Sequence, residues 1–223
     1  MDKELINSHT KIKICGMTCE ADIKAVNTYL PDYIGFVLFF PKSNRNISIE
    51  QAEHLLEKVD KKIRTVAVVV SPTTEQIRQI EKAGFDYIQI HGTVTEDVYK
   101  QCKLPILRAF NVSDLDKLNE YEVKGYVFDS KTPGSGKTFD WSLLDNIRQR
   151  QKTDASKDVS HKKNKKMIFL AGGIDETNVK RAISQVAPDV IDLSSAVEKT
   201  SEDGTFHGKD PEKIRTIVTM VHD

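Results

Sequence analysis

The 223-residue chain is 39% hydrophobic and carries 33 Lys plus Arg against 33 Asp plus Glu. This balance does not favour a nucleic acid or an anionic membrane surface as a partner, because both attract an excess of basic groups. No apolar run reaches the roughly 18 residues of a membrane-spanning helix, and the first residues, MDKEL, lack the pattern of a secretory signal. Three cysteines without a C-x-x-C pair argue against a disulfide framework or a zinc site, so we expect a cytoplasmic protein.

Eight short apolar runs rich in β-branched residues predict eight strands. They span 11–15, 33–38, 64–70, 86–90, 105–109, 125–129, 167–171 and 189–193. Several are almost continuously apolar, which is typical of strands buried on both faces of a parallel sheet. Their starts are 19 to 31 residues apart, except for one gap of 42 between the sixth and the seventh.

Helix-start signals lie between these strands. Residues 48–51 and 93–96 have capping-box spacing, and Ser71-Pro72 and Asp210-Pro211 place a cap residue before a proline. Eight strand–helix repeats in this length predict an α/β fold, a single-domain (β/α)8 TIM barrel covering 1–223. An open doubly wound sheet is the alternative, but it normally has fewer strands and a G-x-G-x-x-G turn after the first one.

Residues 148–166 depart from the overall charge balance, with eight Lys or Arg against two Asp. The segment lacks the aromatic residues that would stack on bases. It is therefore predicted to be a solvated surface excursion of the barrel that fills the long gap. We do not expect it to be a nucleic-acid arm or a domain linker.

Two candidate proton-transfer residues end predicted strands. Cys15 ends the first strand, and Asp129 ends the sixth. In a (β/α)8 barrel the loops after the strands form the functional rim. A thiolate can act as a base, and a partly desolvated aspartate can keep a proton near pH 7, so the pair predicts an isomerase that needs no metal or redox cofactor. The alternatives are a packing cysteine and a loop-capping carboxylate.

Small residues after the last two strands predict a phosphate site. Gly172-Gly173 follows the seventh strand, and Ser194-Ser195 follows the eighth. Glycines let backbone N–H groups approach a phosphate closely, so a small phosphorylated substrate is expected, although two ordinary tight turns would look alike. Residues 134–138 (GSGKT) are similar to the end of a P-loop, but Lys131 stands where that motif needs glycine. That segment is predicted to be a loop that moves over the mouth.

Three further polar residues are candidates for substrate binding. Arg45, after the second strand, has a donor fork suited to a carboxylate, and a solvated arginine is equally consistent. Asp192 precedes the serines and faces either the core or the mouth, where it would hold a sugar hydroxyl. His91 ends the fourth strand as a binding residue or a hydrogen-bonded structural histidine.

Seven segments together resemble the phosphoribosylanthranilate isomerase family. They are KICGMT (13–18), GFVLFFPKSNRNIS (35–48), QIHG (89–92), FDSKTPGSGKTFDW (128–141), LAGGIDETNV (170–179), IDLSSAVE (191–198) and GKDPEKIR (208–215). They run from the first strand to the last helix in the family's order.

The resemblance implies a (β/α)8 barrel of tryptophan biosynthesis without a cofactor. Its reaction is the Amadori rearrangement of N-(5-phosphoribosyl)anthranilate to 1-(2-carboxyphenylamino)-1-deoxyribulose 5-phosphate. By this resemblance Cys15 is the general base, Asp129 the general acid and Arg45 the ligand of the anthranilate carboxylate. The backbone at 172–173 and 194–195 is expected to hold the 5-phosphate, and a monomer is expected.

Three features depart from the family pattern: Ala196 in place of a frequent glycine, a shorter PGSGK loop, and the 148–166 segment. A histidine-pathway isomerase would use carboxylates and carry phosphate sites in both halves, whereas Cys15 and the loop at 71–73, which lacks a double glycine, argue against it. A catalytically silent binding barrel is the other alternative. Such a relative would be expected to lose Cys15 or Asp129, and both are present.

Overall fold

The computed structural model describes residues 10–111, 122–129, 140–144, 166–200 and 206–222. The predicted moving loop at 134–138 lies outside these residues, as does the basic segment 148–166 apart from its last residue, Lys166.

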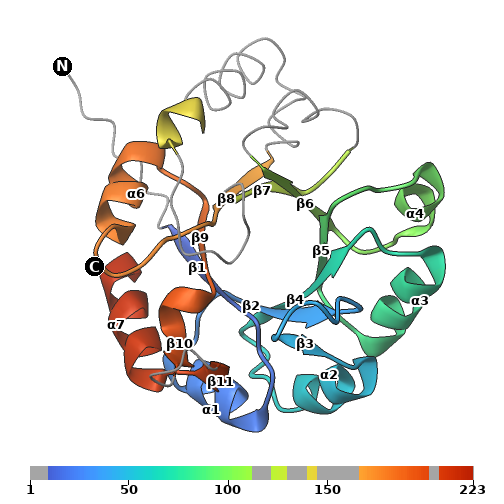
Figure 1. The fold of residues 1–223 in the computed structure, drawn as a ribbon, viewed down its shortest axis with the longest axis horizontal. Helices are drawn as coiled ribbons and strands as arrows, with labels where there is room; N and C mark the ends of the chain where they lie inside the picture. Colours follow the sequence, from blue (N-terminus) through green and yellow to red (C-terminus); the bar gives the residue numbers. More distant parts are fainter. Residues whose placement is uncertain (1–9, 112–121, 130–139, 145–165, 201–205, 223) are drawn as a thin grey trace.

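The core of the fold is a closed parallel barrel (Figure 1). Its strands are β1 (Lys11–Cys15), β2 (Tyr33–Leu38), β4 (Arg64–Val70), β5 (Tyr87–His91), β6 (Ile106–Asn111), β7 (Gly125–Asp129), β8 (Met167–Leu170) and β9 (Val190–Leu193). Each pairs in parallel with its neighbours, and β1 pairs with both β2 and β9, which closes the ring. The short β3 (Asn46–Ile47) pairs beside β2. The predicted (β/α)8 fold is confirmed, with strand ends shifted by no more than two residues.

Helices surround the barrel on the outside (Figure 1). They are α1 (Glu20–Tyr29), α2 (Ile49–Leu56), α3 (Thr74–Ala83), α4 (Glu96–Gln101), α6 (Val179–Val186) and α7 (Pro211–His222), with the 3-10 turns η2 (Trp141–Leu144) and η4 (Ser195–Val197). An antiparallel hairpin of β10 (Glu198–Thr200) and β11 (Phe206–Lys209) follows η4. No helix in the described part of the chain is both long enough and apolar enough to cross a membrane.

Two of the four predicted helix starts are confirmed. Ser48 caps α2 in a capping box with Gln51, and α7 begins at Pro211 after Asp210, whose carboxylate accepts from the next turn. The starts predicted at 71–72 and 93–96 are wrong. Helix α3 is capped by Thr73, and α4 by Thr95.

The physical reason is a link between two loops at the rim of the barrel. Ser71 adopts a left-handed conformation (φ +47°), and its Oγ accepts a hydrogen bond from the backbone N–H of Thr93 at 2.9 Å. Gly92 (φ +69°) makes this approach feasible, because a Cβ there would lie 2.4 Å from Ser71 Oγ. Ser71 and Thr93 therefore join two loops instead of capping helices.

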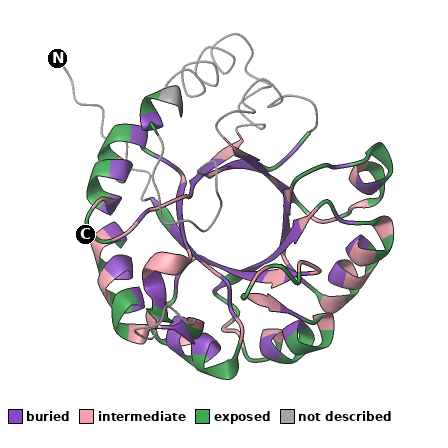
Figure 2. Ribbon diagram, in the orientation of Figure 1, coloured by how far each residue is buried: buried purple, intermediate pink, exposed green. Residues whose placement is uncertain are grey.

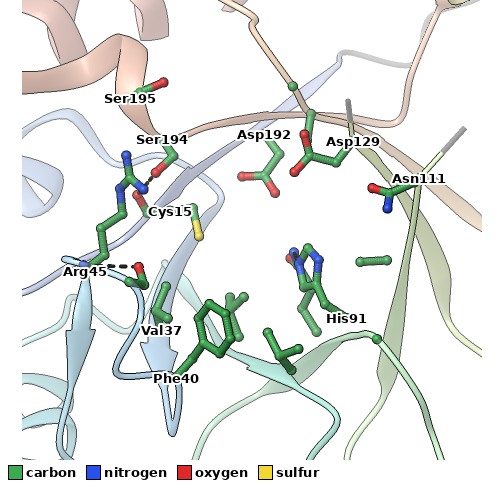
Figure 3. Close-up of a pocket in the computed structure, with 18 of the residues that line it drawn as sticks. Cys15, Val37, Phe40, Arg45, His91, Asn111, Asp129, Asp192, Ser194 and Ser195 are labelled. Atoms are coloured by element: carbon green, nitrogen blue, oxygen red, sulfur yellow. Dashed lines mark hydrogen bonds between the residues drawn. The ribbon is translucent and has the colours of Figure 1, made fainter. Parts of the chain in front are cut away.

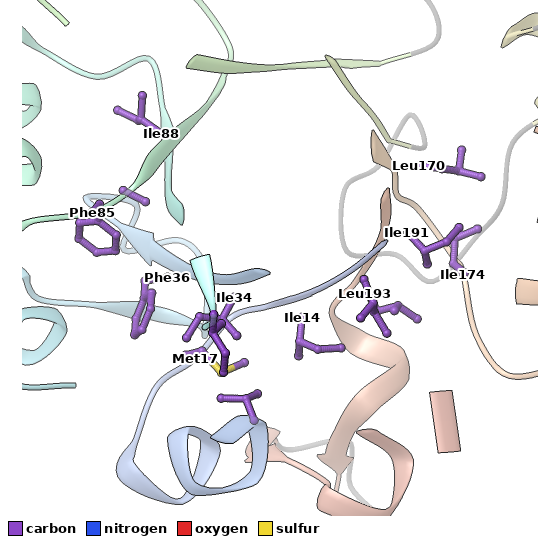
Figure 4. Packing of buried hydrophobic residues seen from close by; sticks show 14 of the residues in the cluster. Ile14, Met17, Ile34, Phe36, Phe85, Ile88, Leu170, Ile174, Ile191 and Leu193 are labelled. Carbon is purple, nitrogen blue, oxygen red and sulfur yellow. The ribbon is translucent and has the colours of Figure 1, made fainter. Parts of the chain in front are cut away.

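Side chains alternate between two buried regions along each strand. One face packs against the helices, as Ile14, Ile34 and Ile191 do (Figure 4). The other face fills the barrel interior, so the strands are buried on both sides while the outer helix faces are exposed (Figure 2). On β1 this alternation directs Ile12 and Ile14 toward the helices, and Lys13 and Cys15 toward the interior.

Candidate active site

A cavity of about 850 Å³ occupies the end of the barrel where the strands terminate. Its lining includes all nine residues predicted from the sequence: Cys15, Arg45, His91, Asp129, Gly172, Gly173, Asp192, Ser194 and Ser195. The structure therefore brings together residues separated by up to 180 positions. In Figure 3 the side chains of Cys15, His91, Asp129 and Asp192 point into the same space.

Cys15 is held at the end of β1 by a tight turn. The backbone N–H groups of Gly16 and Met17 both donate to the carbonyl of Gly35, at 2.8 and 2.9 Å, and Ser194 Oγ donates to the carbonyl of Cys15 at 3.1 Å. Gly16 has φ +91°, and a Cβ there would lie 2.6 Å from Cδ of Arg45. Glycine is therefore suited to this position for two reasons: it adopts the left-handed conformation of the turn, and it leaves room for the Arg45 side chain.

Next to the cysteine lies a buried ion pair that the sequence analysis missed. Lys13 Nζ contacts the Asp192 carboxylate oxygens at 3.0 and 2.8 Å, and both side chains are almost completely shielded from solvent. Burial alone would lower the pKa of Lys13, but Asp192 and then Cys15 raise it above its usual value. Lys13 is therefore a buried ammonium ion two residues before the thiol.

Burial raises the pKa of the Cys15 thiol above its usual value. The ammonium of Lys13 is the strongest influence in the opposite direction, whereas the Asp192 carboxylate adds to the rise. The resting side chain is therefore a protonated thiol at neutral pH.

Arg45 reaches the cavity in a fixed orientation. Its Nε and Nη2 donate to the two carboxylate oxygens of Glu198 at 2.5 and 3.0 Å. Glu198 also accepts from the buried Lys209 at 2.9 Å, and Lys209 donates to the Ser194 carbonyl at 3.1 Å. Burial would raise the pKa of Glu198, but the two cations together hold it below its usual range. Sequence reasoning missed Glu198 and Lys209.

His91 ends β5 and is uncharged near neutral pH. Burial lowers its pKa to about 4, and the positive charges of Lys13 and Arg108 add to this effect. Its Nε2 therefore accepts a hydrogen bond from the amide nitrogen of Gln89, at 2.8 Å. The buried Oε1 of Gln89 has no partner among the described residues.

The predicted phosphate loops meet at one edge of the cavity. Gly172 and Gly173 have φ of +82° and +66°, the left-handed region that favours glycine. The Gly173 carbonyl accepts from the side chain of Asn178 at 2.8 Å, which fixes the turn after β8. Ser194 and Ser195 lie where β9 passes into η4.

Asp129 ends β7, beside its register partner Asn111 on β6. Two strands, β8 and β9, separate it from β1 around the ring, so it approaches the cavity from a different side than Cys15 (Figures 1 and 3). Across the described residues, no group of three or more His, Cys, Asp or Glu is arranged to hold a metal ion.

Comparisons with known proteins agree with this geometry. The family model described as N-(5'phosphoribosyl)anthranilate (PRA) isomerase matches residues 12–220. N-(5'-phosphoribosyl)anthranilate isomerase from Clostridium kluyveri is 38% identical over 218 residues, which cover 96% of this chain and 98% of the relative.

Solved structures with similar folds bear the same name. Phosphoribosyl anthranilate isomerase from Thermotoga maritima is 28% identical with a TM-score of 0.76, over 95% of this chain and 98% of the other. A phosphoribosyl anthranilate isomerase in complex with reduced 1-(o-carboxyphenylamino)-1-deoxyribulose 5-phosphate is 25% identical with a TM-score of 0.75, over 94% and 97%.

Proposed function

Since this chain belongs to the N-(5'-phosphoribosyl)anthranilate isomerase family, aldose–ketose isomerases of tryptophan biosynthesis, we propose that Cys15 and Asp129 are its general base and general acid. The observation that carries the proposal is that both side chains enter one cavity from different strands. The solved relative that holds a reduced 5-phosphate product analogue supports N-(5-phosphoribosyl)anthranilate as the substrate.

The first step opens the ribose ring. Asp129 donates its proton to the ring oxygen as the C1–O bond breaks, and the nitrogen lone pair forms the C1=N bond of a protonated Schiff base. The step requires Asp129 to be protonated when substrate binds. Asp129 leaves it as a carboxylate.

The second step moves the hydrogen from C2. Cys15 first releases its thiol proton to solvent and acts as the thiolate. The thiolate takes the C2 proton, and the C2–H electrons form the C1=C2 bond while the C=N electrons return to nitrogen. The resulting enolamine becomes the ketone when C1 gains a proton and the C2 hydroxyl loses one. Neither proton transfer requires a change in oxidation state of the protein.

The remaining predicted residues bind the two charged ends and the sugar. We propose that Arg45 binds the anthranilate carboxylate, and that the backbone of 172–173 and 194–195 binds the 5-phosphate. In this proposal Asp192 and the neutral His91 contact the ribose chain between them. A single domain, a monomeric state and a cytoplasmic location remain predictions.

The test is turnover of phosphoribosylanthranilate by the purified protein, followed by the loss of anthranilate fluorescence. We expect turnover in the wild type and a fall in kcat of about 10²–10⁴-fold in Asp129→Asn and in Cys15→Ser, with little change in ligand binding. Near wild-type turnover in Cys15→Ser would remove the cysteine from the mechanism. A folded wild type without turnover would favour the silent binding barrel.

A further inference from the structure

We propose that Lys13 is a positioning residue for Cys15: its ammonium group, anchored by Asp192, lies against the sulfur and stabilises the thiolate. This inference rests on the proposed role of Cys15 as the general base. It assigns a function in the reaction to a lysine that lies inside a barrel strand, away from the rim loops.

The first support is the packing around Gly35 on β2. A Cβ at Gly35 would lie 2.8 Å from Cys15 Sγ and 3.2 Å from Lys13 Nζ, so the sulfur and the ammonium share the space that the missing side chain leaves. Lys13 and Cys15 are two residues apart on β1, and successive residues of a strand alternate faces. Both side chains therefore face the interior at the same place.

The second support is the fixed position of the ammonium. Lys13 is completely buried, and both oxygens of Asp192 hold its Nζ at 3.0 and 2.8 Å. A flexible lysine at a surface would be screened by water, whereas a buried and anchored charge acts at full strength on its neighbours. The ion pair thus keeps a positive charge beside the thiol throughout the reaction.

The third support is the charge balance around the thiol. Three cations act on it, Lys13 from β1, Lys209 from β11 and Arg45 from the loop before β3. Asp192 opposes them directly, and Glu198 pairs with the other two cations. Three positive and two negative charges leave one positive charge, which a thiolate would neutralise. Lys13 has the largest effect on the thiol of the three.

The test measures the thiolate directly. On a Cys19→Ser, Cys102→Ala background Cys15 is the single cysteine of the chain, so ultraviolet absorbance of the thiolate reports its titration. Lys13→Met should raise the midpoint by about one pH unit or more, a tenfold loss of thiolate well below the midpoint. Asp192→Asn should lower the midpoint, because the Asp192 carboxylate no longer competes with the Cys15 thiolate for the charge of Lys13. General damage to the site would not shift the two midpoints in opposite directions.

The double variant Lys13→Met, Asp192→Asn leaves neither member of the pair charged. It is the substitute if Lys13→Met does not fold, since an unpaired buried Asp192 is costly. Its midpoint should lie above that of the parent. A midpoint unchanged or lowered in the lysine variant overturns the proposal. Cys15→Ser turnover tests the base role separately, because the titration does not depend on catalysis.

Discussion

The two ends of the barrel interior differ in chemistry. Tyr33 and Tyr87 are the first residues of β2 and β5, and Tyr33 packs edge-on against Tyr87 and against Phe169 of β8, with ring centroids 5.8 and 5.5 Å apart. Toward the carboxyl ends, the interior instead holds the Lys13–Asp192 ion pair beside the Cys15 thiol. The aromatic end gains stability from apolar packing. The polar end holds buried charges in fixed positions, and the stability of the fold alone does not explain why charges are buried there.

Substitutions at the two ends should therefore have different effects. Apolar burial contributes free energy roughly in proportion to area, so the aromatic end should dominate the free energy of unfolding. A buried ion pair contributes little net stability compared with apolar packing, because desolvation offsets the attraction. Substitutions at the polar end should therefore change kcat and KM more than they change the free energy of unfolding.

The largest expected effect on stability is at the aromatic end. Phe169 is fully buried in the interior, and Phe169→Ala should lower the free energy of unfolding by about 3–5 kcal/mol through lost contacts and a cavity. Chemical denaturation measures this, and kcat of the folded fraction should stay near the wild-type value. Cys15→Ser is the matched control: its kcat should fall, whereas its free energy of unfolding should stay near the wild-type value. A large fall in kcat in Phe169→Ala would break the division between the two ends.

Much of the fold could be predicted because each barrel strand is apolar enough to be recognised from its own residues. The gathering of the nine candidate residues around one cavity was also predictable, since they end strands or follow them, and parallel strands place those ends together. The caps at Ser71 and Thr93 were mispredicted because these residues bond to each other across two loops. A contact between loops leaves no local signal.

The charged partners were missed for a related reason. The sequence Lys13-Ile14-Cys15 alternates polar and apolar residues, a pattern that usually marks a strand with one solvated face. Only the pairing of β1 with β9, which sets Lys13 beside Asp192, turns that polar face inward. Glu198 is 153 positions from Arg45 in the chain, so the ion pair between them could not be predicted from neighbouring residues.

A smaller effect is expected from pH, through the histidine at the polar end. The pKa of His91 is about 4 in the folded protein against an ordinary value of 6.5, because burial disfavours the imidazolium. Its contribution to stability is therefore complete above about pH 6.5 and is lost as pH falls from there toward 4. The free energy of unfolding, measured by chemical denaturation across this range, should fall by about 2.5 kcal/mol.

Replacement of the imidazole isolates this contribution. His91→Gln should flatten the stability profile between pH 6.5 and 4, because glutamine does not titrate. The exposed His207, in the variant His207→Gln, controls for the removal of a histidine elsewhere. An equally steep profile in His91→Gln would assign the pH dependence to other groups of the polar end.

The smallest expected effect is at the rim of the barrel, where Arg45 lies. Arg45→Ala leaves Glu198 paired with Lys209 at 2.9 Å, so the buried carboxylate keeps a counter-charge and the fold should persist. Loss of the charged donor should raise KM for phosphoribosylanthranilate by about 10–100-fold, more than any fall in kcat. Arg45→Lys keeps the charge without the planar fork and should fall between Ala and wild type. Steady-state kinetics and chemical denaturation separate these cases. A fall in kcat at unchanged KM would show that Arg45 stabilises the transition state and does not bind the ground state. A loss of stability would show that Arg45 contributes mainly to packing.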